Sequence, residues 1–437
     1  ITLTAQPITW QRTYGGTNMD YGYYIVQTPD EGFIAVGLKR IDTSPLMFAM
    51  RLNRFGDTIW TKTFLSNRAS GIVELTDGNY VISGWFPHDP LIKIDLNGNL
   101  IWTKYNEAGE IKSSRDSGFF VNRNGVLKKF NDDGTVLWAF DFLKYMNSAE
   151  LWGFGTFPGN EVLLIGVVHD TLPGMNRFIL KVNKIGQFEF FRRFNSAYWP
   201  NEVVCPDSLS FVYSSTSGRS VSLIKCDLYG NSIWSKRLDT IPSNASTSLE
   251  DLVECNDKGF AMTGWYDAGD FDLFIRIIKS DKSGNLQWKR LYGFGDNDVG
   301  LCIRETRDSG FAVIGIRDNY NLGDIYIIKT DKFGYANPPV GISGTQQPTS
   351  FAQQNMKLYP NPFNSFSILE FDLHELHPAS IRIYDIEGKE VKSFYYSELR
   401  LGTNTVRIDA GGLPTGIYFC KMVSNGSASI VKMLLIK

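Results

Sequence analysis

Long apolar runs are absent from this 437-residue sequence, and so is a strong charge of either sign. No stretch approaches the ~18 apolar residues that a membrane-spanning helix needs, so we expect no membrane span. The 44 Lys and Arg residues nearly balance the 46 Asp and Glu residues, which leaves a net charge of −2. This balance gives no reason to expect nucleic acid or an anionic membrane as a partner. The hydrophobic content of 43% can still supply a core.

Residues that commonly carry chemistry are also scarce. The cysteines are odd in number and lack CxxC spacing, so they predict neither a zinc site nor a disulfide framework. We expect most of them to be small buried hydrophobic residues: Cys205, Cys226, Cys255, Cys302 and Cys420. The four histidines stand without a nucleophile elbow, an HExxH motif or a P-loop: His88, His169, His374 and His377. The sequence therefore supplies no catalytic residue and no metal-ligand set, and catalysis is less favoured than binding.

Instead, the sequence contains seven copies of one short motif, the repeated phrase. The phrase consists of Lys or Arg, any residue, Asp or Asn, two residues, and Gly. Its copies begin at Arg51, Lys93, Lys129, Lys181, Lys225, Lys279 and Lys329. Four residues after the Gly, five copies have Trp: Trp60, Trp102, Trp138, Trp234 and Trp288. The fourth copy has Phe190 there and the seventh has Pro338. A repeat with a period of tens of residues is typical of a modular fold.

Each phrase has the chemistry of a hairpin turn. Asp or Asn opens a type I turn, and the following Gly takes the left-handed backbone conformation. A second turn lies upstream in most copies, as in DEGF (30–33) and DSGF (308–311). Each unit therefore contains four short antiparallel strands, which we call A to D from the inside outward, and such a unit is a β-propeller blade. The sequence predicts an all-β fold with a seven-bladed propeller over residues 7–337.

The N-terminal residues complete the last blade in this prediction. PITWQRTY at residues 7–14 is similar to the strand D text TIWTKTF at 58–64, and Trp10 supplies the tryptophan that the seventh copy lacks. We predict that residues 7–14 pair beside residues 323–330, so that the ring closes and leaves no free sheet edge.

The repeated cation has two interpretations. Seven basic residues on one ring could form a docking surface for an anion. Alternatively, each cation could pair with the acid of the A–B turn in its own blade, because both turns lie at one end of the blade. Six copies have that acid, and only the fourth lacks it: Asp30, Asp77, Asp116, Asp207, Asp257 and Asp308. We therefore favour local pairing, with under ~1 kcal/mol from each exposed pair.

The opposite face of the ring, made by the B–C and D–A loops, varies in length and is where binding usually resides. Its candidate ligand-binding residues are Trp85, Trp199, Trp265, Tyr266, Asp267 and Tyr320. Aromatic rings can cover the apolar side of a sugar while carboxylates take its hydroxyl groups. The alternative is that Trp85 and Trp265 pack between blades.

Two loops on this face are rich in Asp. GDNDVG (295–300) and DAGDFD (267–272) place carboxylates two residues apart, as the hard cation Ca²⁺ favours. Neither completes a twelve-residue calcium loop, and ordinary turn chemistry explains such acids. No other cofactor is predicted.

The composition changes near the C-terminus. PPVGISGTQQPTSFAQQNM at residues 338–356 is rich in Pro, Gly, Ser and Gln and predicts a linker. Residues 357–437 then alternate apolar and polar residues between Gly-containing turns, which predicts a small β-sandwich.

These C-terminal residues resemble the type A sorting domain of the type IX secretion system of the Bacteroidetes. The motif residues are Tyr359, Pro360, Asn361, Pro362, Gly388, Gly416, Tyr418 and Lys437. The resemblance implies export into the periplasm, passage across the outer membrane by the type IX secretion machinery, and then cleavage and release or anchoring. ITLTAQ at residues 1–6 fits the remnant of an export signal, or simply a leader to the first strand.

The predicted function is a secreted or cell-surface propeller that acts as a binding or adhesion module, for carbohydrate or for another surface protein. The alternative is a secreted enzyme that acts on polysaccharide. Paired carboxylates in the mouth of the propeller channel would favour the enzyme, and an aromatic face would favour the binding module.

Overall fold

The computed structural model describes most of the chain. The described residues are 8–16, 18–41, 44–146, 149–169, 177–194, 200–217, 220–241, 245–267, 273–293, 297–317, 323–336, 356–373, 379–385, 390–396, 399–400, 402–424 and 427–436. The chain divides into two compact units, Ile1–Gly341 and Ile342–Lys437. The predicted export remnant at 1–6 and nearly all of the predicted linker at 338–356 lie outside the described residues.

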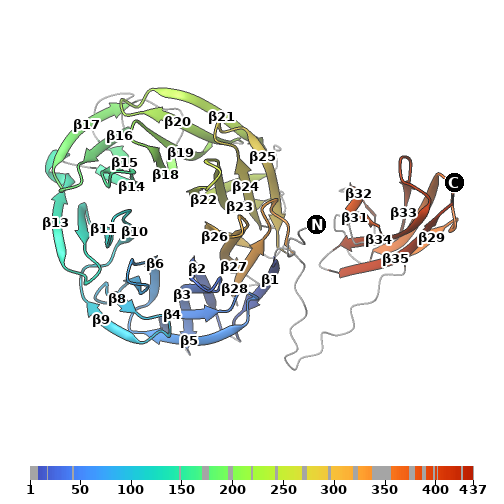
Figure 1. Cartoon of the computed structure of the whole chain (residues 1–437), viewed down its shortest axis with the longest axis horizontal. Coiled ribbons are helices and arrows are strands. Elements are labelled where there is room, and N and C mark those ends of the chain that lie inside the picture. Colours follow the sequence, from blue (N-terminus) through green and yellow to red (C-terminus); the bar gives the residue numbers. More distant parts are fainter. Residues whose placement is uncertain are drawn as a thin grey trace, which may run out of the picture. The chain divides into compact units, whose positions relative to one another are not determined.

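The first unit is a ring of seven four-stranded antiparallel sheets around a central opening (Figure 1). Blades one to three are built from β2 (Asp20–Gln27), β3 (Phe33–Ile41), β4 (Ser44–Leu52), β5 (Thr58–Phe64), β6 (Arg68–Glu74), β7 (Tyr80–Trp85), β8 (Leu91–Ile94), β9 (Leu100–Lys104), β10 (Glu110–Ser113), β11 (Phe119–Arg123), β12 (Val126–Phe130) and β13 (Val136–Asp141). A short 3₁₀ helix, η1 (Phe142–Tyr145), follows the third blade.

Blades four to six repeat the same order of strands. They are built from β14 (Ala149–Thr156), β15 (Val162–Val168), β16 (Arg177–Val182), β17 (Phe188–Phe194), β18 (Pro200–Asp207), β19 (Ser210–Ser217), β20 (Ser220–Asp227), β21 (Ser232–Thr240), β22 (Ser246–Glu254), β23 (Phe260–Asp267), β24 (Leu273–Ser280) and β25 (Leu286–Tyr292). The seventh blade has β26 (Val299–Glu305), β27 (Phe311–Arg317) and β28 (Asp324–Thr330), and β1 (Trp10–Tyr14) is its outermost strand. The predicted seven-bladed all-β fold is confirmed.

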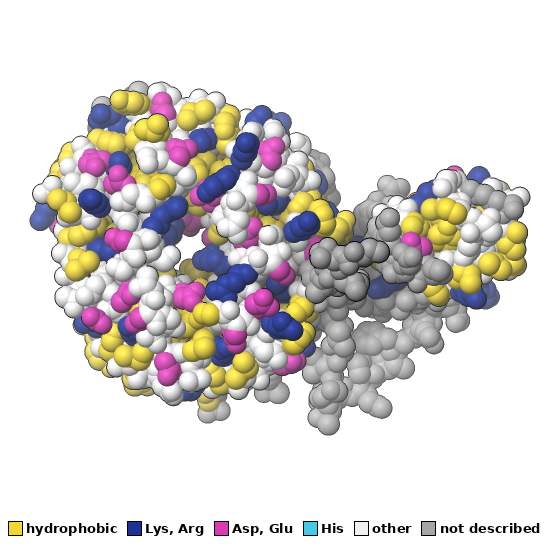
Figure 2. All heavy atoms as spheres, in the orientation of Figure 1, with side chains coloured by type: hydrophobic (Ala, Val, Ile, Leu, Met, Phe, Trp, Pro, Cys, Tyr) yellow, Lys and Arg dark blue, Asp and Glu magenta, His cyan; other side chains and the backbone are white. Residues whose placement is uncertain are grey.

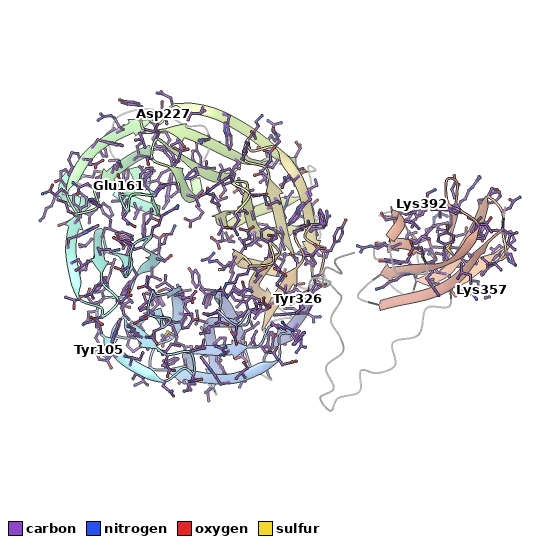
Figure 3. The ribbon with its side chains drawn as sticks, in the orientation of Figure 1. Tyr105, Glu161, Asp227, Tyr326, Lys357 and Lys392 are labelled. Atoms are coloured by element: carbon purple, nitrogen blue, oxygen red, sulfur yellow. The ribbon has the colours of Figure 1, made fainter. Side chains whose placement is uncertain are left out.

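The N-terminal strand closes the ring, as predicted. Strand β1 pairs antiparallel with β28, with Trp10 opposite Lys329 and Tyr14 opposite Ile325. Tyr326, on the same strand as Lys329, donates a hydrogen bond from its hydroxyl to Gln11 (Figure 3). The seventh blade therefore contains both the first and the last strand of the unit.

The repeated phrase forms the predicted C–D turn. Asp95 shows the chemistry: its Oδ1 accepts hydrogen bonds from the backbone N–H groups of Asn97 and Asn99, both at 2.8 Å. Gly98 follows with a φ of 72°, in the left-handed region where a side chain is strained.

The repeated tryptophan joins one blade to the next. Trp60 donates a hydrogen bond from its indole N–H to the carbonyl oxygen of Leu96, in the following blade, at 3.2 Å. Its ring lies so close to Gly98 that a Cβ there would come within 2.9 Å of it. The same arrangement brings tryptophan rings against Gly56, Gly134, Gly186, Gly284 and Gly334. Only the contact with Gly230 uses phenylalanine, and the residue is Phe194 rather than Phe190.

The repeated cation pairs with the acid of its own blade, as favoured above. Lys93 Nζ lies 2.6 Å from Asp77 Oδ2, and Lys279 Nζ lies 2.7 Å from Asp257 Oδ2. Four further blades match this geometry, with separations of 2.5–2.9 Å: Arg51–Asp30, Lys129–Asp116, Lys225–Asp207 and Lys329–Asp308. In the fourth blade Lys181 lies 3.0 Å from Glu189 and 3.7 Å from Glu161, which Figure 3 labels.

The cations of these pairs are less exposed than the sequence analysis assumed. Most of the cations are buried rather than exposed; Lys93 and Lys329, for example, are each only 3% exposed. A buried ammonium is costly without its partner, whereas an exposed one is not. The pairs therefore matter more to stability than their position at a turn suggests.

The second unit is a small β-sandwich. One sheet has β29 (Lys357–Tyr359), β30 (Phe366–Leu373) and β33 (Gly402–Asp409). The other has β32 (Glu390–Tyr396), β31 (Ala379–Tyr384), β34 (Gly416–Ser424) and β35 (Ser427–Leu435). Their apolar residues share one core, which includes Phe371, Ile381, Tyr418 and Met433.

We expect Trp10→Ala to lower the free energy of unfolding of the propeller by about 3–5 kcal/mol. Trp10 is only 6% exposed and donates a hydrogen bond to Arg54 O, so its loss leaves a cavity at the closure. Denaturant unfolding measures the change. Trp85→Ala is the control, because Trp85 is 52% exposed and we expect a change of about 0.5 kcal/mol or less. Equal losses in the two variants would contradict the role of Trp10.

We expect Asp308→Asn to destabilise the chain by roughly 1–3 kcal/mol, because it leaves the buried Lys329 ammonium without its counter-ion. Adding Lys329→Met should recover part of that loss, since the unpaired charge is then gone. Urea unfolding of the two single variants and the double variant tests this. Additive losses would show that the two residues do not act as a pair.

Candidate functional site

A hollow lies in the centre of the ring. It has a volume of about 900 Å³ and is lined by the innermost strand of every blade: β2, β6, β10, β14, β18, β22 and β26. Residues of the A–B turns also line it, including Arg115, Asn256, Lys258 and Arg307. The hollow therefore reaches the face that carries the repeated phrases, which is not the face that the sequence favoured. Figure 2 shows Lys and Arg side chains around the central opening, with Asp and Glu between them.

The channel wall is strongly charged but nearly balanced. Its acids are Glu74, Glu110, Glu202, Asp251, Glu254 and Glu305. Its cations are Lys112, Arg115, Lys258, Arg304 and Arg307. Several are paired: Arg304 lies 2.6 Å from Asp251, and Lys258 lies 3.3 Å from Glu254. A wall of hydrogen-bonded ion pairs suits a polar ligand that both donates and accepts hydrogen bonds.

One lysine in this wall contacts two carboxylates. Lys112 Nζ pairs with Glu202 Oε1, lies 3.5 Å from Glu110 Oε1, and donates to Phe154 O at 2.6 Å. Burial alone would lower the pKa of Lys112, but the charges of Glu202 and Glu110 outweigh it and raise that pKa above its usual range. The ammonium is therefore held in its charged form.

Glu110 is the carboxyl with the most altered acidity. Burial, together with the nearby charge of Glu202, raises the pKa of Glu110 to about 7, against the opposing effect of Lys112. Its side chain is 33% exposed, so water in the channel reaches it although protein surrounds it. Near neutral pH this carboxyl can therefore give or take a proton.

The aromatic residues predicted for the opposite face have different environments. Trp85, the last residue of β7, is 52% exposed. Trp265, Tyr266 and Asp267 end β23 and are partly buried. Tyr266 packs against a buried core cluster, with the Arg276 guanidinium 5.4 Å from its ring, so it has a packing role.

The predicted ligand-binding residues that the structure describes come from two different blades. Trp85 belongs to blade two, whereas the three residues of β23 belong to blade six. Trp199 and Tyr320 lie outside the described residues, as do Asp270, Asp272 and Asp296 of the two Asp-rich loops.

The loop around Trp85 is firmly held. Ser66 Oγ donates to Trp85 O and accepts from Trp85 N, both at 3.0 Å. The Arg68 guanidinium lies 4.6 Å from the centre of a Trp85 ring. Phe86, which follows, is 60% exposed and has a φ of 39°. Asp89 anchors the far end by accepting from Phe86 N and pairing with Arg123 at 2.6 Å. Two adjacent aromatic rings are thus presented to solvent by a fixed backbone.

Sequence reasoning missed the channel residues. The available signal is the alternation of Glu110, Ile111 and Lys112, which places two charges on one side of a strand. The position of Lys112 is apolar in blades two and six, at Val73 and Val253, but charged in blade seven, at Arg304.

The sorting-motif residues tie the second unit together. Asn361 donates from Nδ2 to Lys432 O and accepts at Oδ1 from Leu434 N. The Tyr359 hydroxyl donates to Glu370, and the carbonyl oxygen of Pro360 accepts from Ser367 Oγ.

At the other end of the motif, Tyr418 donates its hydroxyl hydrogen to Pro414 O at 2.7 Å. Gly416 is the first residue of β34. Pro362 lies in the turn between β29 and β30, and Gly388 and Lys437 lie outside the described residues.

Hydrogen bonds therefore join the turn after β29 to β35, the last strand of the sandwich. Residues 357–437, which contain both, match the family model of a secretion system C-terminal sorting domain. Residues 357–437 are a type IX secretion sorting domain. Such a domain directs its chain to the secretion machinery, and the protein is exported to the cell surface or secreted. Among the described residues, no helix is long and apolar enough to cross a membrane.

The solved structures that are similar to this chain have low sequence identity to it. PorZ, a surface component of the type IX secretion system of Porphyromonas gingivalis, is 11% identical with a TM-score of 0.47; the match covers 97% of this chain and 60% of PorZ. Sqt1 from Chaetomium thermophilum is 10% identical with a TM-score of 0.47, over 73% and 97% of the two chains. The Dos1 propeller is 12% identical with a TM-score of 0.41, over 75% and 97%. Similarities of this size carry no argument about function, and no curated protein matches the sequence.

We expect Glu110→Gln to change how stability depends on pH. The pKa of Glu110 is raised from 4.5 to about 7, so the folded chain binds this proton more tightly than the unfolded chain between those values. The free energy of unfolding should therefore fall as pH rises through that window, and Gln should remove this loss. Denaturant unfolding from about pH 5 to about pH 8 should show Glu110→Gln gaining on the wild type. Parallel curves would contradict the raised pKa.

Proposed function

We propose that this exported propeller is a binding module for carbohydrate, and that the ligand stacks on the exposed rings of Trp85 and Phe86. The observation that carries the proposal is the exposure of these two adjacent rings, 52% and 60%, on a loop fixed by hydrogen bonds. The apolar face of a sugar ring matches an aromatic surface of this kind.

The alternative role of Trp85, packing between blades, is disfavoured by the exposure of its side chain. The tryptophan that does pack between blades at the closure, Trp10, is 6% exposed. Positive φ values at Phe86, His88 and Asp89 hold this loop in a conformation that residues other than Gly rarely adopt. Such strain is common where a loop presents a ligand-binding surface.

Neighbouring groups supply polar contacts to the same region. His88 lies beside Tyr105, with ring centres 6.0 Å apart, and Tyr105 is 57% exposed (Figure 3). The Arg68 guanidinium, which stacks on Trp85, also lies 5.6 Å from the ring of Tyr23. Hydrogen-bond donors beside exposed rings are what a sugar requires.

A glycan array probed with the exported protein tests the proposal. We expect Trp85→Ala with Phe86→Ala to weaken binding to any glycan found by at least about tenfold, which corresponds to ~1.4 kcal/mol. Leu209→Ala is the matched control, because Leu209 is 75% exposed at the A–B turn of blade five, on the other face. Unchanged binding by the double variant, or the absence of any glycan ligand, would overturn the proposal.

A second candidate is a polysaccharide-active enzyme in the channel. It is favoured by Glu110 and Glu202, two carboxyls beside the same ammonium, one of which has a pKa near 7. An acid and a base of this kind are what glycoside hydrolysis uses. It stands second because Lys112 already engages both carboxyls. Release of new reducing ends from a bound polysaccharide, lost in Glu110→Gln, would favour the enzyme over the binding module.

A further inference from the structure

Two aspartates, Asp20 and Asp324, lie where the ring closes, and one carboxylate oxygen of each is buried without a hydrogen bond from the described residues. Strand β1 runs into a short connection, residues 15–19, and β2 then begins at Asp20. Asp20 donates its backbone N–H to Gly323 O, in blade seven, at 2.7 Å. Asp324 follows Gly323 and begins β28. The two carboxylates therefore start two strands that meet at the junction of blades seven and one.

Both carboxylates have an oxygen that is buried and unsatisfied. Asp20 is 2% exposed. Among the described residues, Oδ1 of Asp20 and Oδ1 of Asp324 have no hydrogen-bond partner. A Cβ on Gly15 would overlap Asp324 Oδ1, so the connection passes directly against this oxygen. A carboxylate oxygen buried without a donor is costly.

The cations near the junction do not offset the cost of burying these two carboxylates. Burial raises the pKa of Asp20, and the opposing influences are Lys39 and the backbone N–H of Arg40. Burial and the charge of Asp20 raise the pKa of Asp324, opposed by Arg317. Asp324 thus senses Asp20 as a like charge, and a cation bound between the two carboxylates would relieve this repulsion.

We propose that the junction of blades seven and one is a Ca²⁺ site with Asp20 Oδ1 and Asp324 Oδ1 as its protein carboxylate ligands. Backbone carbonyl oxygens and water complete the shell, since Ca²⁺ takes six to eight oxygen ligands in adaptable geometry. The described residues contain no group of three or more His, Cys, Asp or Glu side chains placed to hold a metal. Two carboxylates make a weak site, in the range of about 10⁻⁴–10⁻³ M that extracellular modules show.

The preceding junction of the ring provides an internal comparison. Tyr14, Gly15, Asp20 and Gly22 have the same spacing as Tyr292, Gly293, Asp298 and Gly300. Asp298 is likewise buried and donates its backbone N–H to Leu273 O at 2.9 Å, as Asp20 does to Gly323 O. Phe274 follows Leu273, whereas Asp324 follows Gly323. Of these two junctions, only the one that closes the ring has the second carboxylate.

Thermal unfolding of the full chain with CaCl₂ or with a chelator tests the site. With Ca²⁺ at ~100-fold excess over its dissociation constant, the folded-to-unfolded ratio should rise about 100-fold, and the chelator should reverse this. Asp324→Asn should abolish the response while keeping the size of the side chain. Asp298→Asn should keep it, which separates this junction from the matched one and from sites elsewhere in the chain.

Titration calorimetry with CaCl₂ gives the second readout. We expect the wild type and Asp298→Asn to bind one more Ca²⁺ per chain than Asp324→Asn. A wild type that neither binds Ca²⁺ nor gains stability overturns the proposal, and so does an Asp324→Asn variant that responds as the wild type does. In the latter case Ca²⁺ binds elsewhere in the chain. MgCl₂ in place of CaCl₂ should give a smaller response, because Mg²⁺ demands a stricter geometry.

Discussion

The contact between a tryptophan of one blade and the turn glycine of the next is the interaction on which the ring depends. Each sheet twists away from its neighbour, so a wedge opens between blades toward the rim. The indole fills that wedge, and its N–H binds a turn carbonyl of the next blade, as between Trp138 and Lys184 O. A side chain at the glycine would collide with the ring, which is why the turn needs Gly at that position. The turn formed by the repeated phrase is therefore the surface of one blade against which the tryptophan of the preceding blade packs.

The fold was predictable because its signals are local and repeated. Asp or Asn and Gly at fixed spacing define a turn, and Trp at a fixed distance from it fills the gap between blades. Both signals can be read from a short stretch of sequence. The pairing of Lys93 with Asp77 was also predictable, since the hairpins place both residues at one end of a blade. The burial of Lys93 was not, because the neighbouring blade provides it: Asp132 O, in blade three, accepts from the same ammonium.

The channel was harder to foresee. Its charges come from inner strands of different blades, and Lys112 and Glu202 meet although ninety residues separate them. Irregular pairing adds to the difficulty, because β18 contains two bulges that shift which side chains face the axis. On the opposite face, the segments 81–86 and 261–266 are similar in sequence, yet Phe86 is exposed and Tyr266 packs against a core.

Because β1 pairs with β28, the ring can close only after its last strand has been synthesised. Trp10 leaves the ribosome early and must wait for Lys329, its partner in the seventh blade. Until then the molecule is an open arc with an unpaired strand edge at its end, which invites pairing with other chains. The sorting domain comes after that last strand in the sequence. A chain whose sorting domain has been synthesised therefore already contains every strand of the ring.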